Sequence, residues 1–179
     1  MIGTDQATTI AAEFWLPVVA VIAANTLLFI FCSIVKDNSW IDAFWGITFI
    51  VPIAVVWIQR STDPALLDVT PQIDARMILS FTCICIWGIR LALHIGCRHT
   101  QEDFRYQDFR NKWGVHGTFW LYVQFYCFIF LLQAVFSLIV NSAALYIAIF
   151  SASKGLIWTD YLGAAIWLFG FIFELVGDA

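Results

Sequence analysis

An arginine and a histidine lie inside one of the long apolar runs of this sequence. Helical spacing of three and four residues places Trp87, Arg90, His94 and Arg98 along one stripe. A charged side chain in the middle of a membrane span costs about 2.5 to 3.5 kcal/mol on insertion scales, so it requires a partner. We therefore expect the stripe to face other helices. The alternative is that Arg90, about two turns from the next loop, extends to the interface.

Two acids, Glu174 and Asp178, form a second stripe near the end of the last apolar run. Like charges four residues apart on a helix repel each other, so these carboxylates should have a cationic partner or a ligand. Arg90 and Arg98 are the candidate partners. Burial of such a carboxyl group could raise its pKa enough for proton transfer. The alternative is that the acids only mark where the helix leaves the membrane.

Two further groups of polar residues suggest binding. Arg105 and Arg110 lie in a polar stretch that alternates charged and aromatic residues, and they could hold an anionic head group or a cofactor phosphate. The same stretch could instead be an amphipathic helix on the membrane surface. Asp42 stands at the start of another apolar run, where a helix N-terminus favours an acid, and capping alone would explain it.

Composition predicts the environment that these side chains must share. Of the 179 residues, 61% are apolar and 12% are charged, whereas soluble domains carry about 25% charged residues. The apolar runs are continuous rather than alternating, which favours helices over a β-barrel. The sequence therefore predicts an all-α, polytopic transmembrane helix bundle in a lipid bilayer.

Several classes of function lack their sequence signature. The net charge is -4 and no basic stripe is present, so we expect no nucleic-acid partner. The five cysteines lack metal-ligand spacing, and we interpret them as reduced packing residues with no metal site. No Ser/His/Asp arrangement, P-loop, GxGxxG or HExxH motif occurs.

Segments of about 20 apolar residues predict five spans after an N-terminal tail of residues 1–13. The fourth apolar stretch is too long for one span, and Asn141-Ser142 predicts a break or an interfacial half-helix within it. The expected spans are Phe14–Val35, Asp42–Ile58, Met77–Cys97, a segment from Phe119 within the stretch that ends at Phe150, and Trp158–Val176.

The distribution of Lys and Arg predicts the orientation. A polar loop at residues 98–118 and the first loop together hold five cations, and the loops on the other side hold three. With five spans, this bias places the N-terminal tail outside or in a lumen. The polar loop and the end of the last span would then be cytosolic.

The order of these segments resembles a known family. Its members are the DUF1295 membrane proteins, relatives of the steroid 5-alpha-reductases, and the resemblance covers about residues 38 to 178. Each motif alone is weak, but the succession is fairly specific. The motifs are Asp42-x-x-Trp45-Gly46, Trp87-Gly88-x-Arg90-Leu91 with His94 and Arg98, Glu102-Asp103-x-Arg105-Tyr106, Gln133, and Gly170-x-x-x-Glu174-x-x-x-Asp178.

The resemblance implies an enzyme of the endoplasmic reticulum or another endomembrane that uses NADPH to reduce a carbon–carbon double bond in a hydrophobic lipid or steroid. Trp87 or Arg90, and Asp42 if protonated, would polarise the substrate carbonyl. Glu174 and Asp178 match positions that line the cofactor site of the reductases, and Arg98 and Arg105 are the further expected cofactor contacts.

The resemblance also leaves alternatives open. Family members usually continue past the acid matched by Asp178 into a segment with an Arg-His-Pro-Asn-Tyr-like motif, and Glu174 replaces an amide found in some reductases. We therefore expect either the N-terminal portion of a longer reductase or a member that does not catalyse. A membrane methyltransferase of related architecture and a non-catalytic subunit with an unknown partner chain are the competing hypotheses.

Overall fold

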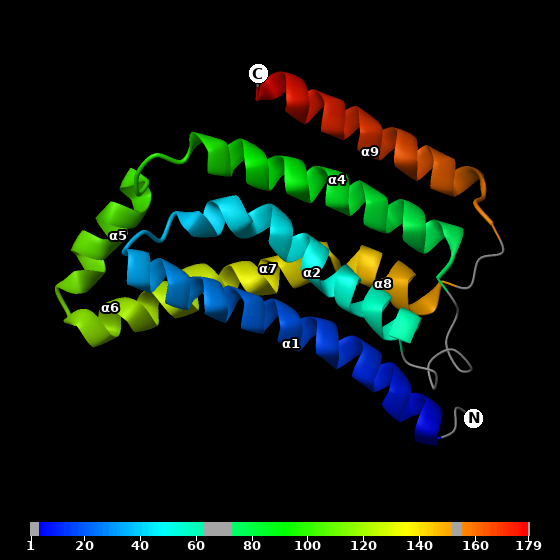
Figure 1. Cartoon of the computed structure of the whole chain (residues 1–179), viewed down its shortest axis with the longest axis horizontal. Coiled ribbons are helices and arrows are strands. Elements are labelled where there is room, and N and C mark those ends of the chain that lie inside the picture. Colours follow the sequence, from blue (N-terminus) through cyan, green and yellow to red (C-terminus); the bar gives the residue numbers. More distant parts are fainter. Residues whose placement is uncertain (1–3, 63–72, 152–154, 179) are drawn as a thin grey trace.

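The computed structural model describes residues 4–62, 73–151 and 155–178, and every regular element in these ranges is a helix. Figure 1 shows them as a bundle of long helices with a short helix, α5, across one end. The all-α prediction is confirmed. The elements are α1 (Thr4–Val35), α2 (Trp40–Thr62), α4 (Ala75–Arg98), α5 (Phe104–Gly114), α6 (Thr118–Phe125), η1 (Tyr126–Leu131), α7 (Leu132–Val140), α8 (Ser142–Phe150) and α9 (Trp158–Gly177).

Within the described ranges, five helical segments are long and apolar enough to cross a membrane, as the sequence predicts. Large apolar side chains point outward from them; Ile34 is 76% exposed and Phe169 is 73% exposed. Such a surface requires lipid as its solvent, which is the environment of an integral, multi-pass membrane protein. The segments are Phe14–Val35, Trp40–Thr62, Ala75–Arg98, Thr118–Val140 and Trp158–Gly177.

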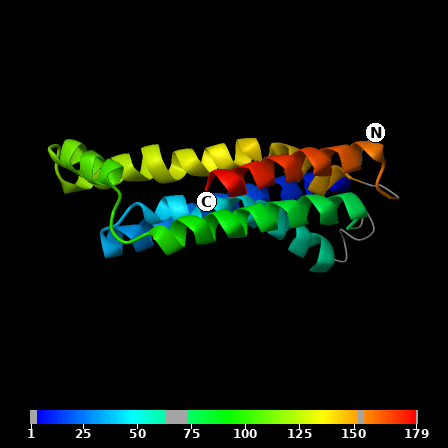
Figure 2. The same cartoon turned by 90° about the horizontal axis from the view of Figure 1, so that it is seen from above.

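The long helices run roughly along one common axis (Figures 1 and 2). α9, α4, α2 and α1 lie side by side in that order, and α7 and α8 pack behind them. One apolar core joins α1, α2, α5, α6 and η1 near the α5 end, and a second joins α2, α4 and α8 toward the other end. α9 differs from the other long helices because it contacts α4 sparsely and none of its described residues is buried.

The second span is longer than the sequence predicts. α2 begins at Trp40 and continues to Thr62, so it includes Arg60, which the sequence places in a loop. Arg60 is only 3% exposed, and its guanidinium donates a hydrogen bond to the Ile149 carbonyl of α8. The buried contact explains why a cation is tolerated in the last turn of this span.

The predicted break at Asn141 is confirmed, because α7 ends at Val140 and α8 begins at Ser142. Asn141 is buried, and its side-chain amide donates to the Phe49 carbonyl of α2 at 2.6 Å. The sequence does not predict the π-helix η1, which interrupts the fourth span. Its first residue, Tyr126, lies with its hydroxyl 3.0 Å from Thr26 Oγ1 of α1.

α2 and α4 cross closely at two glycines. A β-carbon built on Gly46 would lie 2.2 Å from the Gly88 carbonyl oxygen, and one built on Gly88 would lie 2.4 Å from the Gly46 carbonyl oxygen. Only hydrogen fits at either position. Small residues allow this close approach of two backbones, as is common between membrane helices.

Because the two helices approach so closely here, we expect Gly46→Ala and Gly88→Ala to destabilise the protein. Either methyl group would force the two helices apart, at a cost of about 1 to 3 kcal/mol in the free energy of unfolding. Denaturant unfolding in detergent micelles, followed by circular dichroism, measures this cost.

Gly96→Ala on α4 is the matched control, because a β-carbon there would lie 3.9 Å from Ala43 Cβ, an ordinary contact. The control should be neutral or slightly stabilising, since alanine favours helix. Equal stability of all three variants would contradict the tight crossing.

Candidate functional site

Trp87 and Arg90 of α4 bind the acids of α9. The Trp87 indole donates to Glu174 Oε2 at 2.9 Å, and the Arg90 guanidinium pairs with both Glu174 and Asp178. The Arg90 side chain is only 16% exposed. Of the two candidate partners, Arg90 is thus the one that pairs with the two acids. We call Trp87, Arg90, Glu174 and Asp178 the ionic cluster.

His94 and Arg98 continue the same stripe of α4 toward the α5 end. Arg98 Nη1 lies 3.0 Å from His94 Nε2, and because a guanidinium only donates, His94 accepts at this nitrogen. His94 Nε2 is also 3.9 Å from Asp178 Oδ2. No carboxylate of the described residues lies within ion-pair distance of Arg98, so this guanidinium keeps donors for a ligand.

Asp42 and Arg105 belong to a separate polar cluster beside α5. Asp42 accepts from Arg105 Nη2 at 2.9 Å and from the Tyr106 hydroxyl at 2.7 Å. Arg105 Nε also donates to Asp103 at 2.9 Å. Asp42 therefore contacts these side chains rather than Trp87 or Arg90.

The charges around Asp42 favour ion pairs between Arg105 and its two neighbouring carboxylates, Asp42 and Asp103. Hydrogen bonds from the Arg105 side chain and backbone hold the pKa of Asp103 below its usual range. Burial, together with the nearby Asp42 charge, raises the pKa of the Tyr106 hydroxyl, so Tyr106 remains a donor. Arg105 is thus occupied by two carboxylates, and Arg98 is the more available of the two arginines predicted to bind a cofactor.

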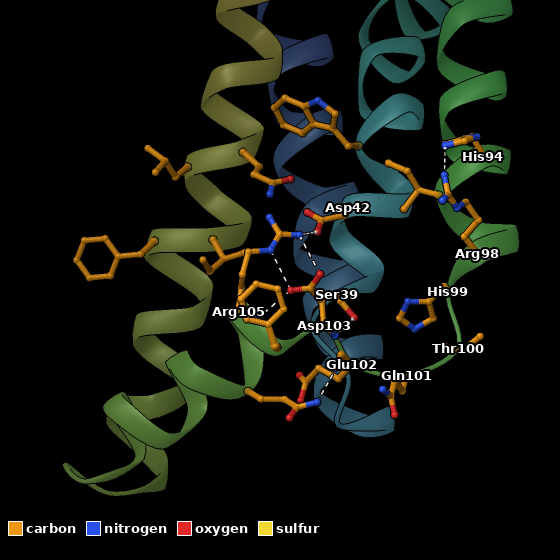
Figure 3. A pocket seen from close by; sticks show the side chains of 18 of the residues that line it. Ser39, Asp42, His94, Arg98, His99, Thr100, Gln101, Glu102, Asp103 and Arg105 are labelled. Atoms are coloured by element: carbon orange, nitrogen blue, oxygen red, sulfur yellow. Dashed lines mark hydrogen bonds and ion pairs between the residues drawn. The ribbon is translucent and has the colours of Figure 1, made fainter. Parts of the chain in front are cut away.

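A polar pocket of about 1060 Å³ lies between these side chains (Figure 3). His94 and Arg98 occupy one side of it, and Asp42, Asp103 and Arg105 occupy another. Phe128, Leu132 and Phe136, from η1 and α7, supply apolar lining. Gln133, singled out by the sequence motif, also lines the pocket, and its buried carbonyl oxygen has no partner among the described residues.

An apolar pocket of about 860 Å³ lies between α4, α8 and α9. Trp87 and Glu174 lie at one end of it, and Arg76 and Asp160 lie at the other. Apolar and small side chains line the intervening length; they include Leu79, Cys83, Ile84, Val140, Ala144, Ile147, Gly163, Ala164, Ile166, Trp167, Gly170 and Phe171.

Aromatic rings connect the two pockets. Trp45, which lines the polar pocket, packs edge-on against Phe49 with ring centroids 5.0 Å apart. Phe49 packs edge-on against Trp87 at 5.1 Å, and both line the apolar pocket. The ionic cluster is similarly shared, since Glu174 faces the apolar pocket and Asp178 neighbours His94 of the polar pocket. The arrangement can hold an apolar molecule and a polar molecule on two sides of one cluster.

Sequence reasoning also missed the ion pairs of Arg76 and Asp37. Arg76 binds Asp160 through two hydrogen bonds of 2.8 and 3.0 Å, which fixes the start of α9 against the start of α4. Asp160 is an acid within a predicted span, and that signal alone could have identified it as needing a partner. Asp37 binds His99 at 2.8 Å and accepts from Ser39, a contact between two loops that no spacing rule predicts.

Removal of Arg90 should destabilise the protein. Arg90→Leu leaves two like charges four residues apart without the cation that they share, and we expect a loss of about 1 to 3 kcal/mol in the free energy of unfolding. Unfolding in detergent measures the loss. Arg98→Leu is the control, with a change of about 0.5 kcal/mol or less, because Arg98 has no carboxylate partner in the described structure. Equal effects of the two variants would contradict the assigned pairing.

The pKa of Asp37 should make the stability of the protein depend on pH. Burial tends to raise its pKa, but hydrogen bonds from Ser39 and His99 outweigh burial and hold the pKa of Asp37 below its usual value. Its contribution is therefore complete above the unfolded pKa, about 3.9, and is lost as pH falls through the lower folded pKa.

We expect Asp37→Asn to flatten part of the loss of stability below about pH 4. Unfolding measured from neutral pH down to acid tests this. Asp108→Asn is the control, since this exposed carboxylate has no hydrogen bond to the described residues. An unchanged acid profile in Asp37→Asn would show that this carboxylate does not couple protonation to folding.

Comparison with known proteins gives a family but no activity. The family model DUF1295, a protein family of unknown function, matches residues 28–179, which include the described parts of α2, α4, α5 and α9 that build both pockets. No curated protein and no solved structure matches the chain. Because the match extends over most of the sequence, the chain belongs to the DUF1295 family.

Proposed function

We propose that the chain is a membrane-embedded oxidoreductase, or the N-terminal portion of one, that reduces a carbon–carbon double bond of a lipid or steroid with NADPH. The observation that carries the proposal is the apolar pocket that ends at Trp87 and the ionic cluster. An apolar substrate would bind more favourably in the pocket than in lipid only if its polar group met hydrogen-bond donors there. Trp87 and Arg90 supply those donors.

The chemistry requires a double bond conjugated to a carbonyl group. Addition of a hydride to the β-carbon places negative charge on the carbonyl oxygen, and a proton from solvent water then adds to the α-carbon. The Trp87 indole N–H and the N–H groups of Arg90 would stabilise that oxygen, in a pocket with a largely apolar lining. Glu174 accepts from both side chains before the substrate arrives, and the substrate oxygen would take its place at the single N–H of Trp87.

The polar pocket is where we propose that NADPH binds, and NADPH supplies the hydride when bound. The side chains that line the polar pocket fit NADPH in part. Arg98 has donors free for a phosphate, and the unpartnered Gln133 carbonyl oxygen could accept from a ribose hydroxyl or a carboxamide. Glu174 and Asp178 would accept hydrogen bonds at the cluster between the pockets. Arg105 fits less well than the sequence suggests, because Asp42 and Asp103 already bind it.

The same proposal includes an orientation and a location. NADPH is a soluble cofactor, so the α5 end, which carries the polar pocket, would face the cytosol. The excess of Lys and Arg around α5 supports this orientation. An endoplasmic-reticulum or other endomembrane location follows from the resemblance to the reductases.

One observation favours a second candidate, a non-catalytic membrane subunit. Arg90 pairs with two carboxylates, and such a pair could serve only to hold α9 against α4. In that case Arg90→Leu would disturb assembly, and neither NADPH nor an enone would bind the protein. A methyltransferase would instead bind S-adenosylmethionine.

The test uses the full chain in lipid nanodiscs with NADPH and a steroid enone. We expect NADPH to raise the unfolding temperature, S-adenosylmethionine to have no effect, and the enone to be reduced. Trp87→Phe should lower turnover by about 100-fold, because it removes one donor to the developing oxyanion.

Trp167→Phe is the matched control, because Trp167 lines the same pocket, stacks on Phe171 and makes no hydrogen bond to the described residues. It should retain turnover within about threefold. Absence of any response to NADPH would contradict the proposal and favour the subunit. Equal losses in both variants would show that Trp87 acts only by packing.

A further inference from the structure

The apolar pocket has a second polar end, which the proposed reaction does not use. Ser80 lies on the wall formed by α4, between the Arg76 end and Trp87. Arg76 and Asp160 satisfy each other through two hydrogen bonds, and Asp160 also accepts from the Ile157 backbone N–H at 2.9 Å. This ion pair therefore lies at the far end of the pocket, and Ser80 follows Arg76 by one turn of α4 toward Trp87.

Ser80 is unlike several other hydroxyl residues of the spans. Thr26, Thr48 and Ser137 each donate to a backbone carbonyl three or four residues earlier in the same helix, at 2.6 to 2.9 Å. Such local bonds are the usual way to satisfy a hydroxyl in a membrane helix. The Ser80 hydroxyl has no hydrogen bond to any described residue, although it lines a largely apolar space. It is therefore free to bind a polar group of a ligand.

The opposite wall of the pocket leaves room for a ligand at this level. β-carbons built on Gly163 and Gly170 of α9 would meet no atom within 4 Å. Both glycines line the pocket, and one full side chain at either position would fill part of it. α9 contacts α4 only sparsely along this length, so the space runs continuously from Ser80 to Glu174.

The spacing of the polar groups defines the ligand. Ser80 and Trp87 are seven residues apart on one straight helix, which is about 10 Å along its axis. We propose that the pocket takes an elongated apolar molecule with a polar group at each end, and that Ser80 binds the hydroxyl or carbonyl group farthest from the reacting carbonyl. This inference rests on the proposed function, because it assumes that the reacting carbonyl lies at Trp87.

Ser80 would thus determine specificity without touching the reacting atoms. An ordinary acyl chain of the bilayer carries no polar group at its far end, so it leaves the Ser80 hydroxyl unsatisfied. A ligand that carries one gains a hydrogen bond away from water, where such a bond contributes about fivefold in affinity. The pocket therefore selects two-ended ligands over the lipids that surround it.

The experiment compares two probes on the full chain in nanodiscs. One is testosterone, which has an enone at one end and a hydroxyl at the other, and the second is the analogue that lacks that hydroxyl. Equilibrium dialysis with labelled probes gives both dissociation constants. We expect testosterone to bind about fivefold more tightly, and Ser80→Ala to reduce this ratio to about one. Ser80→Thr, which keeps a hydroxyl, should restore most of the ratio.

Thr82→Ala is the matched control, because Thr82 is exposed on the same helix, lies outside the pocket and makes no hydrogen bond to the described residues. It should keep the fivefold ratio. Equal affinities for the two probes in the unmodified protein, or a ratio that persists in Ser80→Ala, would overturn the role of Ser80 while leaving the proposed reductase intact. Failure of both probes to bind would overturn the proposed function and this inference together.

Discussion

Lipid does not solvate charge, and the position of α9 depends on this constraint. Arg90 lies within a span and must meet opposite charge, which Glu174 and Asp178 of α9 supply. At the other end of α9, Arg76 and Asp160 meet for the same reason. α9 has no buried residue among those described, so these two ionic contacts, rather than a packed apolar face, set its place beside α4.

Ion pairs also organise the α5 end, where charged side chains converge from several loops outside the spans. Glu102 accepts from the Asn38 backbone N–H at 2.9 Å and from Arg110 at 2.7 Å, so it ties α5 to the loop between α1 and α2. Asp37 and His99 add a second link between the same loops. The polar groups are thereby satisfied by one another. The pocket beside them is lined by these side chains and by Arg98, which donates to His94 and has no carboxylate partner among the described residues.

Features that conflict with lipid could be predicted from sequence, and features that depend on helix order could not. Arg90 and the two acids stood out because charge is rare in apolar runs, and Asn141 stood out for the same reason. The contact of Asp42 with Arg105 and Tyr106 depends on where α5 crosses the bundle, which periodicity does not encode. The π-helix likewise could not be predicted from composition, because its sequence, YCFIFL, would suit an ordinary α-helix equally well.

Ionic attachment of α9 also bears on how an apolar ligand could reach the inner pocket. The α2–α4 crossing at Gly46 and Gly88 is rigid, because any separation would lose a close-packed contact. Separation of α9 from α4 would disturb little apolar packing and would interrupt ion pairs at its two ends. A ligand carbonyl that binds Trp87 and Arg90 replaces part of what Glu174 provides. The ionic cluster that positions α9 would therefore also give up some of its internal hydrogen bonds and form hydrogen bonds to the substrate instead.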